Sequence, residues 1–232
     1  MIQNMQNNGP HFFFDFDSTL VTKESLDMVI ESALAEAEHK DELVAKVNEI
    51  TDLGMEGKLN FTNSLTERFA VVPFSRGHFE EVGEVLRAHI TPGMTELFAE
   101  MAKEGVSAFI ISGGFRESIL PVAHELGVSE DRVFTNTVIY DETGAVVGID
   151  TENVCYTDEG KAPVIEHIKK TFDLAGEFVM VGDGANDLKS YELGAATDFC
   201  GFVANAKRDV IVERAPHVAH TTAELRAFIF SK

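Results

Sequence analysis

The sequence predicts an α/β protein with a doubly wound, mostly parallel sheet and an inserted α-helical cap. Short apolar runs alternate with helical patterns from residue 91 onward, as in chains whose parallel strands are joined by helices. Residues 24–90 instead hold several helical patterns and no convincing strand. We therefore expect a core domain of residues 11–22 and 91–232, interrupted by a cap domain of residues 23–90.

The first part of the chain opens with a strand and continues in helices. HFFFDF, residues 11–16, is an apolar run typical of a fully buried strand. Apolar residues at helical spacing then predict a helix over 24–50, a second over 60–72, and a third over 75–90 that Ser75 caps. These helices make up the predicted cap.

The remaining residues alternate between predicted strands and predicted helices. Apolar runs predict strands at 106–112 and 177–184, and two short edge strands at 197–204 and 217–220. A DETG turn within residues 132–150 predicts a β-hairpin. Helical patterns separate these segments, and we expect helices at 92–105, 114–127, 161–173, 186–194 and 222–230.

The composition of the chain argues against some classes of binding partner and some cellular locations. The chain has 39 acidic and 19 basic residues, and its formal net charge of −20 would repel nucleic acid and anionic lipid, so neither is an expected partner. No apolar run approaches the roughly 20 residues that span a bilayer, and the polar start lacks the pattern of a secretory signal. Cys155 and Cys200 fit no zinc or disulfide spacing. We expect a cytoplasmic protein.

Four polar clusters follow apolar segments or open a helix. They are DFDST, Ser112-Gly113-Gly114, Lys161 at the start of a helix, and GDGANDL. In a doubly wound sheet the reactive loops lie at the carboxyl ends of the strands. We therefore expect three of the clusters to meet at one edge of the sheet, within reach of Lys161.

The aspartates in these clusters suit phosphoryl transfer. Asp15, Asp17 and Asp183 can supply the oxygen ligands that Mg²⁺ prefers. A carboxylate can also attack phosphorus and form an aspartyl-phosphate. Asp17 can protonate the leaving oxygen and later activate water, and it would face the same way as Asp15 if the first strand continues that far.

The other clusters suit a phosphate group. The Ser112 hydroxyl and the backbone amides near Gly113 can donate to phosphate oxygens. Lys161 adds a compact positive charge against the charge of the transferring group. Each cluster alone is common in loops, turns and surfaces, but their combination in this order favours an active site.

The four motifs, in order, resemble those of the haloacid-dehalogenase superfamily of phosphohydrolases, over essentially residues 11–230. The chain is also similar to the phosphoserine phosphatase family within it. DFDSTLVTKE resembles the first motif of that family and includes its trailing glutamate, here Glu24. MEGKLNFTNSLTERFAVV resembles the family's cap segment, and ISGGF, GKAPVI and GDGANDL match its remaining motifs.

The resemblance implies a Mg²⁺-dependent enzyme that hydrolyses O-phospho-L-serine through an aspartyl-phosphate, the last step of serine biosynthesis. Asp15 would be the nucleophile and a metal ligand, and Asp17 the acid/base, with its backbone carbonyl on the metal. Asp183 would complete the metal ligands, and Asp187 would support them. The groups that would contact phosphate or substrate are Ser112, Gly113, Lys161 and Asn186.

The resemblance also implies a pocket for the amino-acid end of the substrate. Glu24 would pair with its ammonium, Arg68 would bind its carboxylate, and Met55 and Phe61 would line the pocket. A zwitterion needs one anion and one cation, and Arg suits a carboxylate. Without this context, Glu24 and Arg68 are interpreted as surface charges of helices, and Met55 and Phe61 as packing within the cap.

Two alternatives stay open at this point. One is a phosphatase or phosphotransferase of the same superfamily that acts on another small phosphomonoester. The other is a phospho-accepting signalling module, which also combines acidic residues, a hydroxyl and a lysine on a doubly wound sheet. The large helical insertion with Glu24 and Arg68 argues against the second alternative.

Overall fold

The computed structural model describes residues 9–55 and 58–232, and it confirms the predicted fold class. Six parallel strands form one sheet in the order β3-β2-β1-β6-β7-β8. The strands of this sheet are β1 (His11–Phe14), β2 (Ser107–Phe115), β3 (Val133–Asn136), β6 (Phe178–Gly182), β7 (Asp198–Phe202) and β8 (His217–Ala219). Strands β4 (Val138–Tyr140) and β5 (Val146–Ile149) form the antiparallel hairpin that the DETG turn predicts.

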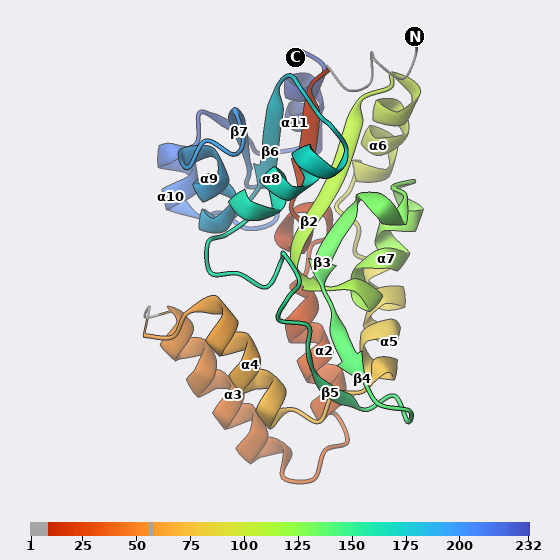
Figure 1. Cartoon of the computed structure of the whole chain (residues 1–232), viewed down its shortest axis with the longest axis vertical. Coiled ribbons are helices and arrows are strands. Elements are labelled where there is room, and N and C mark those ends of the chain that lie inside the picture. The colour runs from red at the N-terminus through yellow and green to blue at the C-terminus, as the bar shows by residue number, and fades with distance from the viewer. Residues whose placement is uncertain (1–8, 56–57) are drawn as a thin grey trace.

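Helices connect the strands and cover the sheet (Figure 1). Four of the described helices lie within residues 23–90: α2 (Ser25–Leu34), α3 (Lys40–Met55), α4 (Phe61–Val71) and α5 (Arg76–Arg87). The others are α6 (Met94–Lys103), α7 (Arg116–Glu125), α8 (Ala162–Thr171), α9 (Ala185–Glu192), α10 (Asp209–Arg214) and α11 (Thr222–Ile229). In the described part of the chain, no helix combines the length and apolar character that a membrane crossing requires.

Several elements differ from the prediction. The single helix expected at 24–50 is two helices, and His39, just before α3, takes a left-handed φ of 62°. The sequence ALAEAEHK at the break consists largely of good helix formers, so it carries no stop signal. Strand β7, expected at an edge, pairs with β6 and β8 and is buried throughout. Helix α10 was not predicted.

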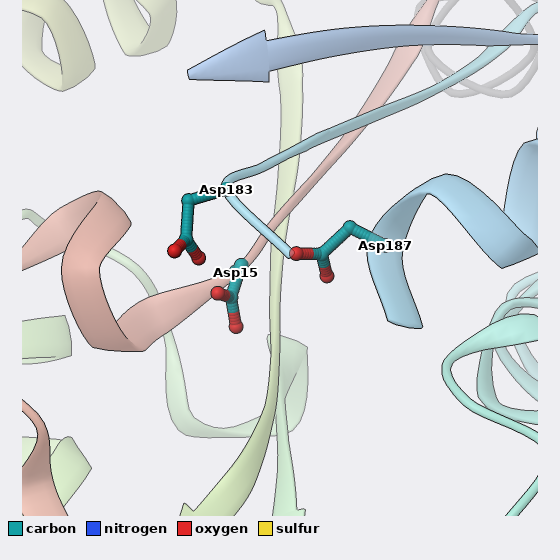
Figure 2. Close-up of side chains that lie close together, drawn as sticks. All are labelled: Asp15, Asp183 and Asp187. Carbon is teal, nitrogen blue, oxygen red and sulfur yellow. The ribbon is translucent and has the colours of Figure 1, made fainter. Parts of the chain in front are cut away.

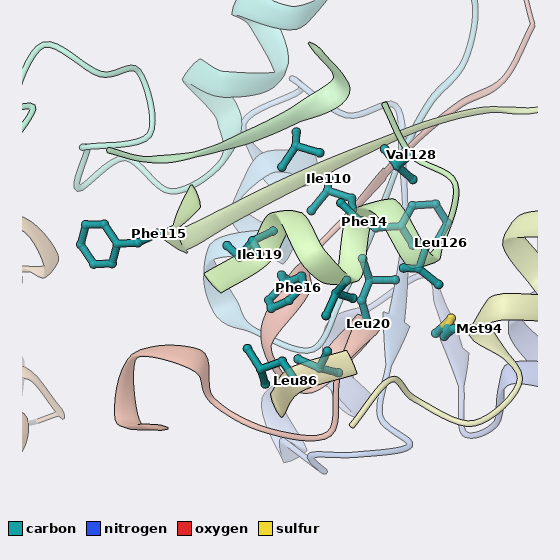
Figure 3. Packing of buried hydrophobic residues seen from close by; sticks show 14 of the residues in the cluster. Phe14, Phe16, Leu20, Leu86, Met94, Ile110, Phe115, Ile119, Leu126 and Val128 are labelled. Carbon is teal, nitrogen blue, oxygen red and sulfur yellow. The ribbon is translucent and has the colours of Figure 1, made fainter. Parts of the chain in front are cut away.

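The sheet separates two hydrophobic clusters, because successive residues of a strand point to opposite faces. In β1, Phe12 and Phe14 pack into one cluster and Phe13 into the other. Figure 3 shows the first cluster, in which Phe14 and Ile110 of the sheet share a core with Leu86 of α5. Part of the helical insertion is therefore continuous with the core of the sheet.

The insertion has two parts with different neighbours (Figure 1). Helices α3 and α4 pair as a hairpin that projects beyond the sheet. Helix α5 packs on α7 so closely that a Cβ at Gly83 would lie 2.7 Å from the carbonyl oxygen of Glu117 and 3.0 Å from Pro121 Cγ. The proposed division into a core and a cap of residues 23–90 remains a prediction.

The contact at Gly83 leads to a matched pair of substitutions in α5. We expect Gly83→Ala to lower the free energy of unfolding by about 1–3 kcal/mol, because its methyl group must displace the backbone of α7. Gly77→Ala is the control, since only Ser75 Oγ lies near its Cβ position, at 3.8 Å, and it should be neutral or stabilising by up to ~1 kcal/mol. Equal urea midpoints for the two variants would contradict this interpretation of the α5–α7 contact.

Candidate active site

Adjacent strands bring three aspartates to the carboxyl edge of the sheet. Asp15 follows β1, and its backbone N–H still donates to the carbonyl of Val181 in the neighbouring β6 at 2.9 Å. Asp183 follows β6, and Asp187 lies in the first turn of α9. Figure 2 shows their carboxylates turned toward one another, and one oxygen from each lies within 4.8 Å of the others.

Glycine makes room for this arrangement. A Cβ at Gly182 would lie 2.3 Å from the carboxylate of Asp187, so no other residue fits there without displacing it. The backbone N–H of Gly184 donates to Asp187 Oδ2 at 2.9 Å and fixes that carboxylate at the start of α9. The glycines of GDGANDL thus position Asp187 beside Asp15.

Two cationic side chains neutralise part of this charge. Lys161 is buried, and its Nζ donates to Asp15 Oδ1 and lies 2.6 Å from Asp187 Oδ1. Arg208 Nε donates to Asp183 Oδ2 at 2.8 Å, and Arg208 Nη2 lies 4.0 Å from Glu24 Oε1. Arg208 was not predicted, because the loop after β7 carries no pattern that marks it.

Burial dominates the electrostatics of the aspartates. It raises the pKa of Asp15 to about 6, against the opposing effect of Lys161, and that of Asp187 to about 6, where the charge of Asp15 adds to the effect. Burial and the charges of Asp15 and Glu24 raise the pKa of Asp17 to about 8. Burial alone would lower the pKa of Lys161, but the two carboxylates beside it raise that pKa above its usual value.

Asp17 lies in a compact turn, Phe16–Leu20, and not in the strand. Its carboxylate accepts a hydrogen bond from the backbone N–H of Ser25 at 2.6 Å. Because β1 ends at Phe14, the strand does not continue as far as Asp17, and strand alternation does not orient that side chain. Ser18 in the same turn has a left-handed φ of 54°, and its hydroxyl donates to Glu24 Oε1 at 2.6 Å.

The donor set suits a hard divalent cation. Asp15, Asp183 and Asp187 offer only carboxylate oxygens, which Mg²⁺ prefers. Together with Asp17 and Glu24, five carboxylates lie near two cations of the described residues, Lys161 and Arg208. When all are ionised, three negative charges remain uncompensated, and a divalent cation would supply most of the missing charge.

A small cavity of about 50 Å³ lies beside this cluster. Lys161, Ser112, Gly113, Asn186 and Phe61 are among its lining residues. The ring of Phe61 covers Gly113 so closely that a Cβ there would lie 3.1 Å from Phe61 Cζ. The structure thus brings the predicted phosphate-binding groups together beneath the first residue of α4.

The residues predicted to bind the amino-acid end of the substrate have separate contacts. Arg68 Nη2 donates to Ser64 Oγ at 3.1 Å, while its buried Nε has no hydrogen-bond partner in the described part of the chain. Burial lowers the pKa of Arg68, and the charge of Asp27 opposes this effect. The described contacts do not join Arg68 to Glu24, and the side chain of Met55 lies outside the described residues.

Comparison with known proteins adds independent findings. Residues 12–192 match the family model of haloacid dehalogenase-like hydrolases. Phosphoserine phosphatase of Rattus norvegicus is 32% identical over 202 residues, which cover 87% of this chain and 85% of the relative. Phosphoserine phosphatase of Methanocaldococcus jannaschii is 32% identical over 215 residues, which cover 90% of this chain and 95% of the relative.

A solved structure agrees with these matches. The crystal structure of a phosphoserine phosphohydrolase-like protein from Francisella tularensis superposes with a TM-score of 0.82 at 30% identity, covering 95% of this chain and 100% of that one. The family model covers most of the chain, and curated relatives match nearly all of it. The chain therefore belongs to the haloacid dehalogenase-like hydrolases and, within them, to the phosphoserine phosphatase family.

Proposed function

We propose that the protein is a Mg²⁺-dependent phosphoserine phosphatase, which hydrolyses O-phospho-L-serine to L-serine and phosphate. The observation that carries this proposal is the contact of buried Asp15 with Lys161 next to Asp183 and Asp187, beside a cavity lined by Ser112 and Phe61. The phosphoserine phosphatases to which the chain is similar support the choice of substrate. We place the reaction in the cytoplasm, as the last step of serine biosynthesis.

In the first half of the reaction, a carboxylate oxygen of Asp15 attacks phosphorus and the bond from phosphorus to the serine oxygen breaks. Asp17 donates its proton to that leaving oxygen, a role that suits a buried carboxyl with a pKa of about 8. Lys161, Ser112 and the amide of Gly113 hold the phosphate oxygens as charge shifts among them. The product of this step is aspartyl-phosphate on Asp15 and free serine.

In the second half, Asp17 accepts a proton from water, and the water oxygen attacks phosphorus. The bond to Asp15 breaks, and phosphate leaves. Asp15, Asp183 and the backbone carbonyl of Asp17 would hold Mg²⁺, with Asp187 supporting them. When bound, the ion supplies positive charge that offsets the repulsion between the anionic nucleophile and the anionic phosphate.

The amino-acid end of the substrate is assigned to Glu24 and Arg68. The buried Nε of Arg68, which has no hydrogen-bond partner among the described residues, is a donor that a carboxylate can satisfy, and an unsatisfied buried donor is costly. Ser18 holds Glu24 next to the turn that carries Asp17. Asn186 lines the cavity from α9 and would contact substrate. Another small phosphomonoester as substrate is the alternative.

The role of Asp15 can be tested by a substitution of nearly equal size. We expect Asp15→Asn to lower turnover of phosphoserine by at least about 10³-fold, because the amide cannot act as the nucleophile. Asp131→Asn, at an exposed position, serves as the control for the change of charge and should keep wild-type turnover. Phosphate release measures both, and turnover near the control value in Asp15→Asn would remove Asp15 as nucleophile.

Substrate choice can be tested with two phosphomonoesters, one that has a carboxylate and one that lacks it. We expect wild-type protein to prefer phosphoserine by more than tenfold in kcat/KM over phosphoethanolamine, which lacks that group. Arg68→Ala should lower kcat/KM for phosphoserine by about 10–100-fold, as the loss of a charge-assisted hydrogen bond predicts, and leave phosphoethanolamine nearly unchanged. An equal loss for both substrates would rule out carboxylate recognition by Arg68.

Metal dependence can be tested by removing bound metal with a chelator and then adding Mg²⁺ back. We expect a chelator to abolish turnover and Mg²⁺ to restore it, because the carboxylate cluster lacks charge compensation without a cation. Mg²⁺ should also raise the melting temperature of the wild-type protein, since a ligand that binds only the folded state stabilises it. Asp183→Asn should weaken that shift. Full turnover after exhaustive chelation would contradict the assignment.

A further inference from the structure

The two ends of α4 are held by different kinds of contact. Near its carboxyl end, Phe69 packs among the rings of Phe74, Phe79 and Phe115, with centroid distances of 4.7, 6.2 and 4.9 Å. Phe74, Phe79 and Phe115 are nearly inaccessible to solvent and belong to the main hydrophobic cluster. This end of α4 is therefore anchored in the core of the protein.

The amino end of α4 is held instead by polar contacts with the loop before α8. The backbone N–H of Thr62 donates to Asp158 Oδ1 at 2.9 Å, and the Thr62 hydroxyl donates to Asp158 Oδ2 at 3.0 Å. The first N–H groups of a helix have no partner within it, and a negative charge is favourable there. Asp158 thus caps α4 from a segment 96 residues away in the chain.

A second contact lies one turn further along the helix. The hydroxyl of Tyr156 lies 2.7 Å from Thr66 Oγ1 and donates to the backbone carbonyl of Thr62 at 3.2 Å. Tyr156 and Asp158 therefore bind consecutive turns of the same helix from one short loop. We call Thr62, Thr66, Tyr156 and Asp158 the α4 latch.

Both sides of the latch, the helix and the loop, are connected to the candidate active site. On the helix side, Phe61 directly precedes Thr62, and its ring covers Gly113 beside Ser112. On the loop side, Asp158 is three residues from Lys161, whose amino group binds Asp15. Closing the latch therefore places the ring of Phe61 over the pocket while Lys161 is in contact with the nucleophile.

The chemistry of the latch suits a contact that breaks in each catalytic cycle. Its bonds are largely exposed, so water can replace them at little net cost, whereas separating the rings around Phe69 would expose buried apolar surface. Local opening occurs where few buried apolar contacts resist it. The first turn of α4, ahead of the buried Leu65, is thus the part that opens, and Leu65 and Phe69 stay packed in the core.

We propose that Asp158 and Tyr156 are positioning residues that latch the amino end of α4 over the substrate pocket. This inference rests on the proposed phosphatase function for its kinetic consequence, but the latch itself is a property of the free protein. Substrate enters when the latch opens, and closure excludes water and sets Phe61 against the phosphate-binding loop. Asp158 and Tyr156 do not touch the reacting atoms.

The test compares Asp158→Asn with Glu159→Gln, a neighbouring exposed acid that undergoes the same change of charge. Asp158 accepts two hydrogen bonds from Thr62, one on each carboxylate oxygen. The side chain in Asp158→Asn has only one oxygen, so it can no longer accept from the Thr62 hydroxyl and the Thr62 backbone N–H on separate oxygens. We expect backbone amides at 61–66 to exchange with deuterium at least threefold faster than in the control, with exchange in β1 unchanged. Tyr156→Phe, which keeps the ring, should give a smaller increase in the same amides.

The kinetic readout separates positioning from catalysis. We expect Asp158→Asn to raise KM for phosphoserine about five- to tenfold and to change kcat less than twofold, because opening α4 weakens binding and leaves the nucleophile in place. Thr62→Val removes the hydroxyl partner, so its effect on KM should not multiply with that of Asp158→Asn in the double variant.

Hydrogen exchange tests whether the latch holds the amino end of α4, and this measurement needs no substrate. If exchange at 61–66 is the same in Asp158→Asn and Glu159→Gln, the latch is wrong, whatever the enzyme hydrolyses. If exchange increases and the wild-type protein turns over phosphoserine, an unchanged KM overturns the positioning role. If the wild-type protein does not act on phosphoserine, the proposed function fails and the exchange result still stands or falls by itself.

Discussion

The contact of Lys161 with Asp15 and Asp187 is the interaction on which the rest of the site depends. Both carboxylates are almost inaccessible to solvent, and a buried carboxylate is costly unless a cation and hydrogen bonds compensate it. Lys161 provides that cation from the start of α8, 146 residues from Asp15 in the chain. Its amino group therefore permits three aspartates to gather at the sheet edge, where burial, with a smaller contribution from their mutual repulsion, raises their pKa values.

The parallel pairing of β1 and β6 supplies the matching geometric constraint. Their register sets Phe14 beside Val181, so that Asp15 and Asp183 emerge nearly level from adjacent strands. A strand buried on both faces favours apolar residues, which explains why the apolar run Phe12–Phe14 ends at Asp15, at the carboxyl edge of the sheet. The apolar pattern of β1 therefore also fixes where Asp15 lies in the candidate active site.

The fold class was predictable because it depends on patterns local to each element. The alternation of apolar runs and helical spacing sufficed for the sheet, and the polar clusters that follow apolar segments or open a helix located Asp15, Asp183, Lys161 and Ser112. The roles of these residues remain predictions, but their proximity is now observed. Predictions failed where tertiary packing decides the outcome, as in the break between α2 and α3 and the interior position of β7.

Other parts of the site leave no trace in the sequence. Arg208 reaches Asp183 from an irregular loop, and Asp158 reaches Thr62 from a polar run that is indistinguishable from ordinary surface. The turn at Phe16–Leu20 depends on the left-handed backbone of Ser18, a conformation that non-glycine residues adopt only where surrounding contacts impose it. Such contacts join residues distant in sequence, so no local spacing predicts them.

The hydrophobic cluster that joins the insertion to the sheet has a consequence for how this enzyme can diverge. Val29 of α2, Leu65 of α4 and Leu86 of α5 share one core with Phe14 of β1 and Ile110 of β2. The insertion is therefore not a module that recombination can exchange intact, because its removal would expose to water the part of that core that it covers. New substrate preferences in such a chain must arise by point substitutions on the pocket side of α4, with the shared interior preserved.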